Sequence, residues 1–246
     1  MSERIYARIS GTGHCLPERV MTNLDLEKLV DTSDQWIQER TGIKERRVAA
    51  DHQTTCDLAE VASQRALEAA GLAPTDIDLL VVGTTTPDLV FPSTACLLQH
   101  RLGLGECGAF DVNAACSGFV YALSVADQFI RSGQAKHVLV VGAETLTRML
   151  DWGDRQTCVL FGDGAGAAVL SADSAPGILS THLHANGAHA DLLKVDVGVS
   201  RGFKPDEPRA GISVSMRGNE VFKVAVNTLG RIVEETLEAN GIDRSE

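Results

Sequence analysis

Apolar residues along the chain follow two kinds of pattern. Continuous apolar runs at residues 77–83 and 137–142 are typical of strands that are buried on both faces of a parallel sheet. Elsewhere apolar residues recur every three or four positions, which predicts amphipathic helices at residues 55–70, 93–102, 117–130 and 219–240. Strands that alternate with helices in this way predict an α/β fold.

Polar capping residues and glycines set the bounds of further elements. A strand is expected at residues 5–11, ended by Gly11-Thr12-Gly13, and a short helix from residue 22 or 23 to residue 30. Residues 32–35 read Thr-Ser-Asp-Gln, a capping-box pattern that opens a second helix, which Thr41-Gly42 ends. The charged run at residues 44–47 is interpreted as a solvated edge.

A glycine cluster at residues 162–166 has some likeness to a dinucleotide-binding loop. Its spacing is GxGxG rather than GxGxxG, and the apolar residues 167–170 predict a strand where the nucleotide-binding fingerprint needs a helix. We therefore interpret these glycines as positions where two backbones approach closely.

Three histidines lie in or just after an expected strand at residues 177–185. His182, His184 and His189 have a spacing that could suit a metal ion, but no cysteine or second acidic cluster completes a ligand set, so no metal site is expected. Residues 194–208 are expected to form a polar loop before the last helix. The apolar residues of that helix expected to face inward are Val221, Val224, Leu229, Ile232, Val233 and Leu237.

The strongest candidate for chemistry is Cys116. It follows an expected strand at residues 109–112 and precedes a helix whose apolar face includes Phe119 and Leu123. A thiol at a strand-to-helix turn lies near free backbone N–H groups and the positive end of the helix dipole, which can lower its pKa by roughly 1–5 units. Its neighbours are small enough to leave room for a substrate. We therefore predict a nucleophilic cysteine, placed like the serine of a nucleophile elbow.

Composition and charge narrow the class of protein. The 246 residues suffice for a large domain or two small ones, and a net charge of −11 argues against nucleic acid or an anionic membrane as a partner. The amino terminus has no apolar signal segment, no run is long enough to span a membrane, and the cysteines form no CxxC pair. A cytoplasmic protein is expected. The cysteines interpreted as structural are Cys15, Cys56, Cys96, Cys107 and Cys158.

A weak internal repeat links the middle of the chain to its end. Residues 65–76 align without a gap on residues 235–246, with identities at Leu67, Glu68, Ala69 and Gly71. The first copy is followed by the apolar strand at residues 77–83, whereas the second copy ends with the chain. Because half of a repeat cannot bury its own apolar faces, we expect the natural protein to continue and complete the second half.

Several long motifs identify the family that this sequence resembles. They are Gly-Thr-Gly at residues 11–13, residues 32–43 around Trp36, residues 91–96, residues 110–119 around Cys116, residues 161–170 and residues 216–223. Together they resemble the β-ketoacyl-acyl carrier protein synthase III enzymes of the thiolase superfamily, which start bacterial type II fatty acid synthesis. The resemblance covers essentially the whole chain.

The resemblance implies a fold and a reaction. The fold would be α/β, with two thiolase-like βαβαβαββ halves in five layers (αβαβα), usually in a homodimer. Residues 1–172 would form the amino-terminal half with the nucleophile, and residues 173–246 the start of an incomplete second half. The enzyme would move an acetyl group from acetyl-CoA, its substrate, onto Cys116. It would then condense that group with malonyl-acyl carrier protein to give acetoacetyl-acyl carrier protein, without a cofactor.

The resemblance also assigns roles to individual residues. Trp36 and Arg155 would hold the two faces of the coenzyme A adenine. Arg40 and Thr32 would neighbour its phosphate and ribose, and Asn219 would lie along the pantetheine channel. Phe91 would cross the dimer interface into the partner's acyl pocket, which Leu146 and Phe161 would line. Arg217 and Lys223, which flank the start of the last helix, are candidates for docking the acidic carrier protein.

The resemblance is incomplete at the carboxyl end. The family's histidine and asparagine for decarboxylation and condensation are expected beyond residue 246, and His184-Ala185-Asn186 follows the wrong strand to replace them. Two alternatives remain open at this point. One is a related acyltransferase of secondary metabolism, and the other is a non-catalytic fragment or acyl-binding module.

Overall fold

A computed structural model describes residues 5–201 and 213–245 of the chain. Its contacts divide the chain into two compact units. Unit 1 contains residues 1–19, 49–145 and 163–183, and unit 2 contains residues 20–48, 146–162 and 184–246. The predicted division into halves at residue 172 stays a prediction.

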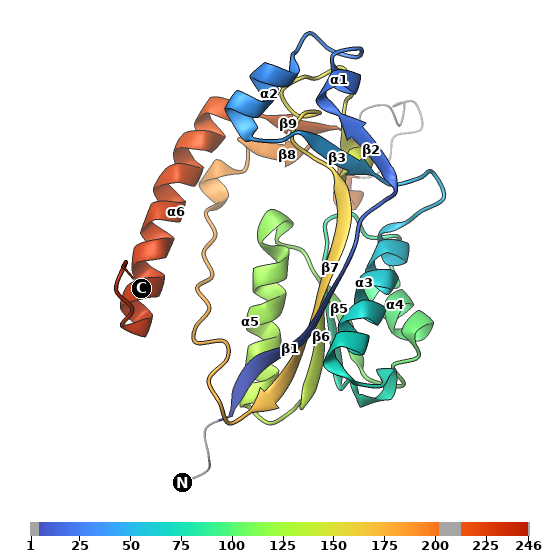
Figure 1. The fold of residues 1–246 in the computed structure, drawn as a ribbon, viewed down its shortest axis with the longest axis vertical. Helices are drawn as coiled ribbons and strands as arrows, with labels where there is room; N and C mark the ends of the chain where they lie inside the picture. The colour runs from blue at the N-terminus through green and yellow to red at the C-terminus, as the bar shows by residue number, and fades with distance from the viewer. Residues whose placement is uncertain (1–4, 202–212, 246) are drawn as a thin grey trace. The chain divides into compact units, whose positions relative to one another are not determined.

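Unit 1 is built on a five-stranded mixed sheet (Figure 1). Its strand order is β1 (Tyr6–Cys15), β7 (Asp163–Asp173), β6 (His137–Thr145), β4 (Leu79–Gly83) and β5 (Gly108–Val112). Strand β4 pairs in parallel with both β5 and β6, whereas β7 is antiparallel to β6 and β1. All five residues of β4 are buried, which confirms the parallel strand predicted from its continuous apolar run.

Helices cover both faces of this sheet. Helices α3 (Thr55–Ala70) and α4 (Thr94–Leu102) lie on one face, and α5 (Gly118–Arg131) lies on the other (Figure 1). Leu80 and Val82 pack in the core beneath α3 and α4, whereas Leu79 and Val81 pack beneath α5. Successive side chains of a strand point to opposite faces, so one apolar run supplies both cores. A 3-10 turn, η1 (Pro74–Asp76), precedes β4.

Strand β1 is longer than its sequence pattern predicted. Gly11 and Gly13 were expected to end it, but they lie inside it and pair with β7. A Cβ atom on Gly11 would lie 2.4 Å from the carbonyl oxygen of Ala66, and one on Gly13 would lie 2.2 Å from that of Ala62. These glycines therefore let the backbone of α3 lie directly against the strand, and they do not mark a turn.

The described residues of unit 2 form two small sheets and three helices. Strands β2 (Arg19–Thr22) and β3 (Glu45–Val48) pair with each other, as do the antiparallel β8 (Leu193–Val195) and β9 (Val214–Met216). The helices are α1 (Asn23–Leu26), α2 (Asp34–Thr41) and α6 (Gly218–Asn240). The 3-10 turns are η3 (Leu146–Met149), η4 (Gly187–His189) and η5 (Val199–Arg201). Helix α1 is a single turn, shorter than the helix predicted to reach residue 30.

The charged run at residues 44–47 is only partly a solvated edge, because Arg46 is buried. Its guanidinium donates hydrogen bonds to Asn23 Oδ1 at 2.8 Å and to the carbonyl oxygens of Val159 and Met21 at 3.2 and 3.3 Å. Burial lowers the pKa of this arginine. Side-chain charge alone did not reveal that this arginine cross-links β2, α1 and the segment around Val159.

The segment at residues 177–185 is not a strand, which contradicts the sequence pattern. One backbone hydrogen bond, from Ile178 N to Ala7 O at 2.8 Å, ties its start to β1. Arg131 holds it from the other side by donating to Ile178 O at 2.7 Å. The expected loop at residues 194–208 also differs, because its first residues belong to β8. Residues 202–208 of that loop lie outside the described residues.

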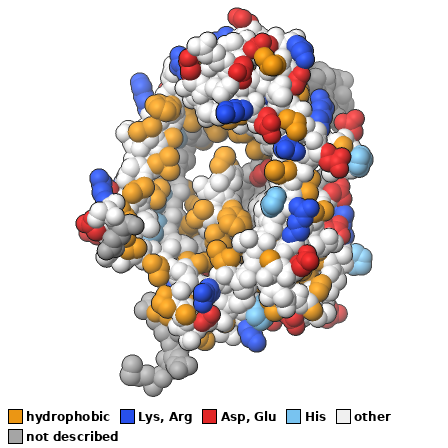
Figure 2. All heavy atoms as spheres, in the orientation of Figure 1, with side chains coloured by type: hydrophobic (Ala, Val, Ile, Leu, Met, Phe, Trp, Pro, Cys, Tyr) orange, Lys and Arg blue, Asp and Glu red, His pale blue; other side chains and the backbone are white. Residues whose placement is uncertain are grey.

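Helix α6 has the predicted bounds at its carboxyl end, where Gly241 adopts the left-handed conformation. The predicted inward face is different: none of the described residues of α6 is buried. Apolar side chains lie along the helix at the surface (Figure 2), with Phe222 69% and Leu229 63% exposed. No helix among the described residues is long and apolar enough to cross a membrane.

Candidate active site

Cys116 lies in a sharp turn between β5 and α5, where the sequence predicted it. The strand ends at Val112, the 3-10 turn η2 (Ala115–Ser117) follows, and α5 begins at Gly118. Ala115 has a φ of 47°, the one positive φ of a non-glycine residue in the described part of the chain. Such a conformation costs of order 1–3 kcal/mol and is typical of functional turns. The Cys116 side chain is exposed, so its thiol is accessible.

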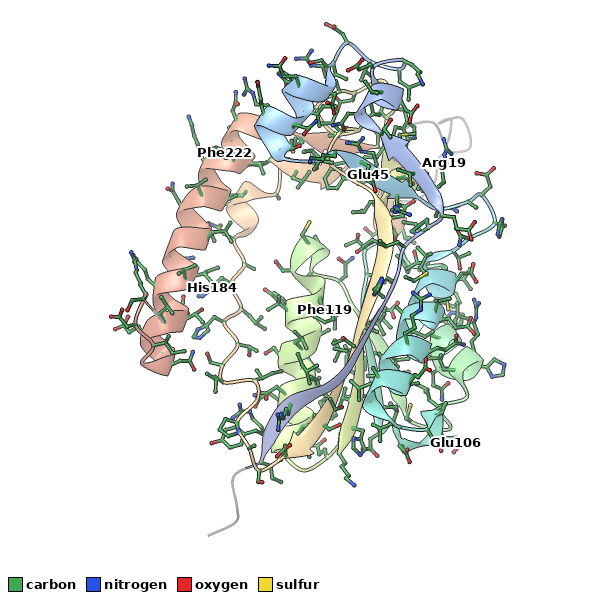
Figure 3. The ribbon with its side chains drawn as sticks, in the orientation of Figure 1. Arg19, Glu45, Glu106, Phe119, His184 and Phe222 are labelled. Carbon is green, nitrogen blue, oxygen red and sulfur yellow. The ribbon has the colours of Figure 1, made fainter. Side chains whose placement is uncertain are left out.

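Two glycines, one at the end of β4 and one within β6, lie against the start of α5 and form a glycine floor for this turn. A Cβ atom on Gly83, the last residue of β4, would lie 2.7 Å from the carbonyl carbon of Gly118. One on Gly142, in β6, would lie 3.2 Å from a ring carbon of Phe119. Phe119 lies in the first turn of α5 (Figure 3). Because neither glycine carries a side chain, the start of α5, and with it Cys116, can lie against the end of β4 and the middle of β6.

Four of the other five cysteines have a raised thiol pKa. Burial raises the pKa of Cys15, Cys107 and Cys158, and it raises the pKa of Cys56 to about 11. A thiol with a raised pKa forms less of the nucleophilic thiolate near neutral pH. Cys96 differs from its structural interpretation in being exposed like Cys116, although its thiol lies 3.6 Å from Ala109 O.

Phe91 lies at the tip of the connection between β4 and α4, and it is 83% exposed. Two carboxylates anchor the connection below the tip. Asp88 accepts hydrogen bonds from Cys56 N and Thr94 Oγ1 at 3.1 and 3.0 Å. Asp111 accepts from the backbone N–H groups of Thr94 and Ala95, and burial raises its pKa. The large apolar side chain of Phe91 is thus exposed on a connection that these hydrogen bonds hold in place.

The residues predicted to hold adenine lie together in unit 2. The guanidinium carbon of Arg155 is 4.9 Å from the centre of the Trp36 ring, and that of Arg40 is 5.8 Å from it. Arg155 also donates to Asp31 O at 2.6 Å. The hydroxyl of Thr32 is buried and finds no hydrogen-bond partner among the described residues. The indole ring of Trp36 thus already stacks against two guanidinium groups, and such a ring is also a surface on which another flat ring can stack.

The remaining predicted residues are distributed over both units. Leu146 and Phe161 are half-buried and belong to unit 2, whereas Phe91 and Cys116 belong to unit 1. Asn219, in the first turn of α6, is exposed. The other two predicted residues, Arg217 and Lys223, are exposed as well, and Arg217 lies 3.9 Å from the carboxylate of Glu220. Their roles stay predictions.

Two of the histidines at residues 182–189 have hydrogen-bond partners close to them in the chain or in α6. His184 points toward α6 (Figure 3), where its Nε2 lies 2.9 Å from the carboxylate of Glu235. His182 Nε2 lies 3.0 Å from Ser180 Oγ. Within the described ranges no three His, Cys, Asp or Glu side chains are grouped so that they could hold a metal ion.

Sequence reasoning missed the polar residues that surround the glycine floor. Glu144 follows Gly142 in β6 and binds the threonines that follow Gly83. A signal was present, because polar residues at the carboxyl ends of neighbouring parallel strands meet at one edge of a sheet. The run Thr84-Thr85-Thr86 and the Glu144 carboxylate occupy such positions.

Comparisons with known proteins place this arrangement in a family. Residues 110–187 match the family model for 3-oxoacyl-[acyl-carrier-protein (ACP)] synthase III. The chain is 67% identical over 243 residues to β-ketoacyl-[acyl-carrier-protein] synthase III of Xanthomonas campestris pv. campestris strain 8004, covering 99% of this chain and 74% of that protein. It resembles the crystal structure of 3-oxoacyl-[acyl-carrier-protein] synthase III from Aquifex aeolicus VF5 with a TM-score of 0.90 and 48% identity. That match covers 98% of this chain and 74% of the other.

A structure from another pathway also resembles the chain. The priming β-ketosynthase of the R1128 polyketide biosynthetic pathway matches with a TM-score of 0.92, covering 98% of this chain and 72% of that one. Its identity is 37%, well below the 67% shared with the Xanthomonas enzyme. The alternative in secondary metabolism is therefore not favoured.

The fold and these relatives define a class, the condensing acyltransferases with a thiolase fold. Within that class, the chain belongs to the β-ketoacyl-[acyl-carrier-protein] synthase III family, the condensing enzymes that initiate fatty acid synthesis.

Proposed function

We propose that Cys116 accepts an acetyl group from acetyl-CoA. The observation that carries this proposal is the exposed thiol of Cys116 on the sharp turn before α5, a place that none of the other cysteines has. The thiolate attacks the thioester carbonyl carbon, and backbone N–H groups at the start of α5 stabilise the oxyanion. The bond between that carbon and the coenzyme A sulfur then breaks, and coenzyme A leaves as a thiolate that takes up a proton.

The acetyl-enzyme then reacts with malonyl-acyl carrier protein. The malonyl group loses carbon dioxide, and the electron pair of the broken bond forms an enolate. The enolate carbon attacks the acetyl carbonyl carbon, the bond to the sulfur of Cys116 breaks, and acetoacetyl-acyl carrier protein is released. The reaction is proposed to use acetyl-CoA and malonyl-acyl carrier protein as substrates and no cofactor.

Adenine recognition is proposed at Trp36 and Arg155, with Arg40, Thr32 and Asn219 binding the rest of coenzyme A. Two stacked contacts at about 3.5 Å each separate the groups on either side of a ring by about 7 Å. Arg155 now lies 4.9 Å from the Trp36 ring centre, so it has to move outward to admit the adenine. Its guanidinium then covers the second face of the ring.

A homodimer is proposed around β5 and Phe91. Strand β5 is an edge of the sheet of unit 1, with backbone groups open to pairing, and the neighbouring Phe91 tip is exposed. We propose that Phe91 enters the acyl pocket of a second copy, a pocket lined by Leu146 and Phe161. The carrier protein is proposed to dock on Arg217 and Lys223, since an acidic partner needs a local basic surface on this acidic chain.

The acetyl transfer is tested by the mass of the Cys116 peptide after exposure to acetyl-CoA. Acetylation is expected at Cys116 in the wild-type chain and is expected to vanish in Cys116→Ser. Cys107→Ser and Cys158→Ser serve as controls and should leave it largely intact. Acetylation that persists in Cys116→Ser would show that another residue is the nucleophile.

A further inference from the structure

Beyond the end of β4, hydrogen bonds to the side chain of Glu144 take over from the backbone pairing between β4 and β6. Gly83 pairs with Gly142 in the register of the two parallel strands. Two residues further along each strand, the Glu144 carboxylate accepts hydrogen bonds from Thr85 N at 2.8 Å and from Thr85 Oγ1 at 3.1 Å. The same carboxylate accepts from Thr86 Oγ1 at 2.6 Å. A charged acceptor strengthens each of these bonds.

Further hydrogen bonds extend this cluster to the neighbouring elements. Thr86 Oγ1 accepts from Thr145 N at 2.9 Å, and Thr55 Oγ1 donates to Thr86 O at 2.6 Å. Thr84 N donates to Val112 O at 3.2 Å, which connects the threonine run to the end of β5. The cluster therefore joins β4, β5, β6 and the start of α3.

The cluster lies directly beyond the glycine floor that supports Cys116. Glycine has the largest conformational freedom of any residue, so the end of β4 at Gly83 is easily displaced. The floor has to stay in place, because Gly83 and Gly142 touch the backbone of Gly118 and the ring of Phe119. Glu144 lies in the part of β6 that pairs with β7, and its carboxylate binds the segment that follows Gly83.

We propose that Glu144 is a positioning residue for the nucleophile. It ties the segment after β4 to β6, the two strands hold the start of α5, and that start sets the position of Cys116. This inference rests on the proposed acetyl transfer, but Glu144 itself need not touch the substrate. A misplacement of about 1 Å in a catalytic group can cost on the order of 100-fold in rate.

The same two strands provide a matched control at their opposite end. The Asp78 carboxylate accepts hydrogen bonds from Lys136 N and His137 N at 2.7 and 2.9 Å, just before β6 and at its start. Asp78→Ala thus removes a carboxylate that joins the same strands far from Cys116. If Glu144 had a purely structural role, Glu144→Ala would change the stability and the acetylation rate in the same way as Asp78→Ala.

The experiment compares Glu144→Ala, Glu144→Gln and Asp78→Ala with the wild-type chain. The rate of Cys116 acetylation at saturating acetyl-CoA should fall about 10- to 100-fold in Glu144→Ala, with the half-saturating concentration unchanged. Glu144→Gln keeps an acceptor for Thr85 N and should recover most of the rate. Asp78→Ala should lower the unfolding temperature but keep the rate. A wild-type rate in Glu144→Ala, or an equal loss in Asp78→Ala, would overturn the proposal.

A second measurement does not depend on acetyl-CoA. Amide hydrogen exchange at residues 114–119 should be about tenfold faster in Glu144→Ala and unchanged in Asp78→Ala. If the wild-type chain is not acetylated, the proposed function fails while the exchange rates still decide the role of Glu144. Should Glu144→Ala not fold, Thr86→Val removes a single hydroxyl of the cluster and should accelerate exchange in the same peptide. Unchanged exchange in that variant would contradict the proposal.

Discussion

Gly83→Ala is the substitution that tests the glycine floor most directly. The new Cβ would lie 2.7 Å from the carbonyl carbon of Gly118, 2.9 Å from its oxygen and 3.0 Å from the backbone nitrogen of Phe119. Ordinary van der Waals contact begins at 3.4 Å, so the start of α5 has to move away by about 0.7 Å. All three atoms belong to the backbone, which cannot yield by changing a rotamer.

The cost of this displacement can be estimated. Inserting an extra methyl group into close-packed surroundings costs about 1–3 kcal/mol of the free energy of unfolding. The displacement also shifts the turn that holds Cys116. Because a misplacement of about 1 Å can cost on the order of 100-fold in rate, acetylation of Cys116 should fall by tenfold or more.

The assay combines urea unfolding with the rate of acetylation at the Cys116 peptide. Gly166→Ala is the matched control, because Gly166 also lies in a strand of the same sheet and its added Cβ would meet nothing within 4 Å. That control should be neutral or stabilised by about 0.4–1 kcal/mol, with an unchanged rate. If Gly83→Ala behaved like Gly166→Ala in both measurements, the close contact between β4 and α5 would not position the nucleophile.

Three further predictions concern unit 2. Trp36→Ala should weaken coenzyme A binding about two- to thirtyfold in calorimetry, while alkylation of Cys116 by iodoacetamide keeps its rate; equal loss of both would indicate misfolding. Lys223→Glu should raise the KM for malonyl-acyl carrier protein about two- to fivefold at low salt, and an unchanged KM there would show a merely solvated helix face. Arg46→Met should lower the free energy of unfolding by about 2–4 kcal/mol in urea, against about 0.5 kcal/mol or less for the exposed neighbour Lys44→Ala; similar losses would contradict the buried role of Arg46.

Local sequence determined the elements whose patterns need no distant partner. Helix α3 has the predicted bounds of residues 55–70, with Thr54 as its cap and the left-handed Gly71 after its last residue, because such caps are satisfied by residues within one turn. The apolar run of β4 predicted a buried strand, because a strand with apolar side chains on both faces needs burial on both faces. Cys116 was predicted to lie between β5 and α5, because the residues before it follow a strand pattern and the apolar residues after it recur with the period of a helix.

Tertiary structure decided the features that depend on residues far apart in the sequence. Gly11 and Gly13 looked like a strand end, yet they continue β1, because the backbone of α3 comes too close for any side chain. Arg46 looked solvated, yet it is buried, because acceptors from three segments surround it. Glu144 was overlooked, because its partners lie about 60 residues earlier in the chain. The sequence thus determined the turn that carries Cys116, the proposed nucleophile, whereas packing alone decided what holds this turn in place, since close contacts and hydrogen bonds between distant segments leave no local pattern.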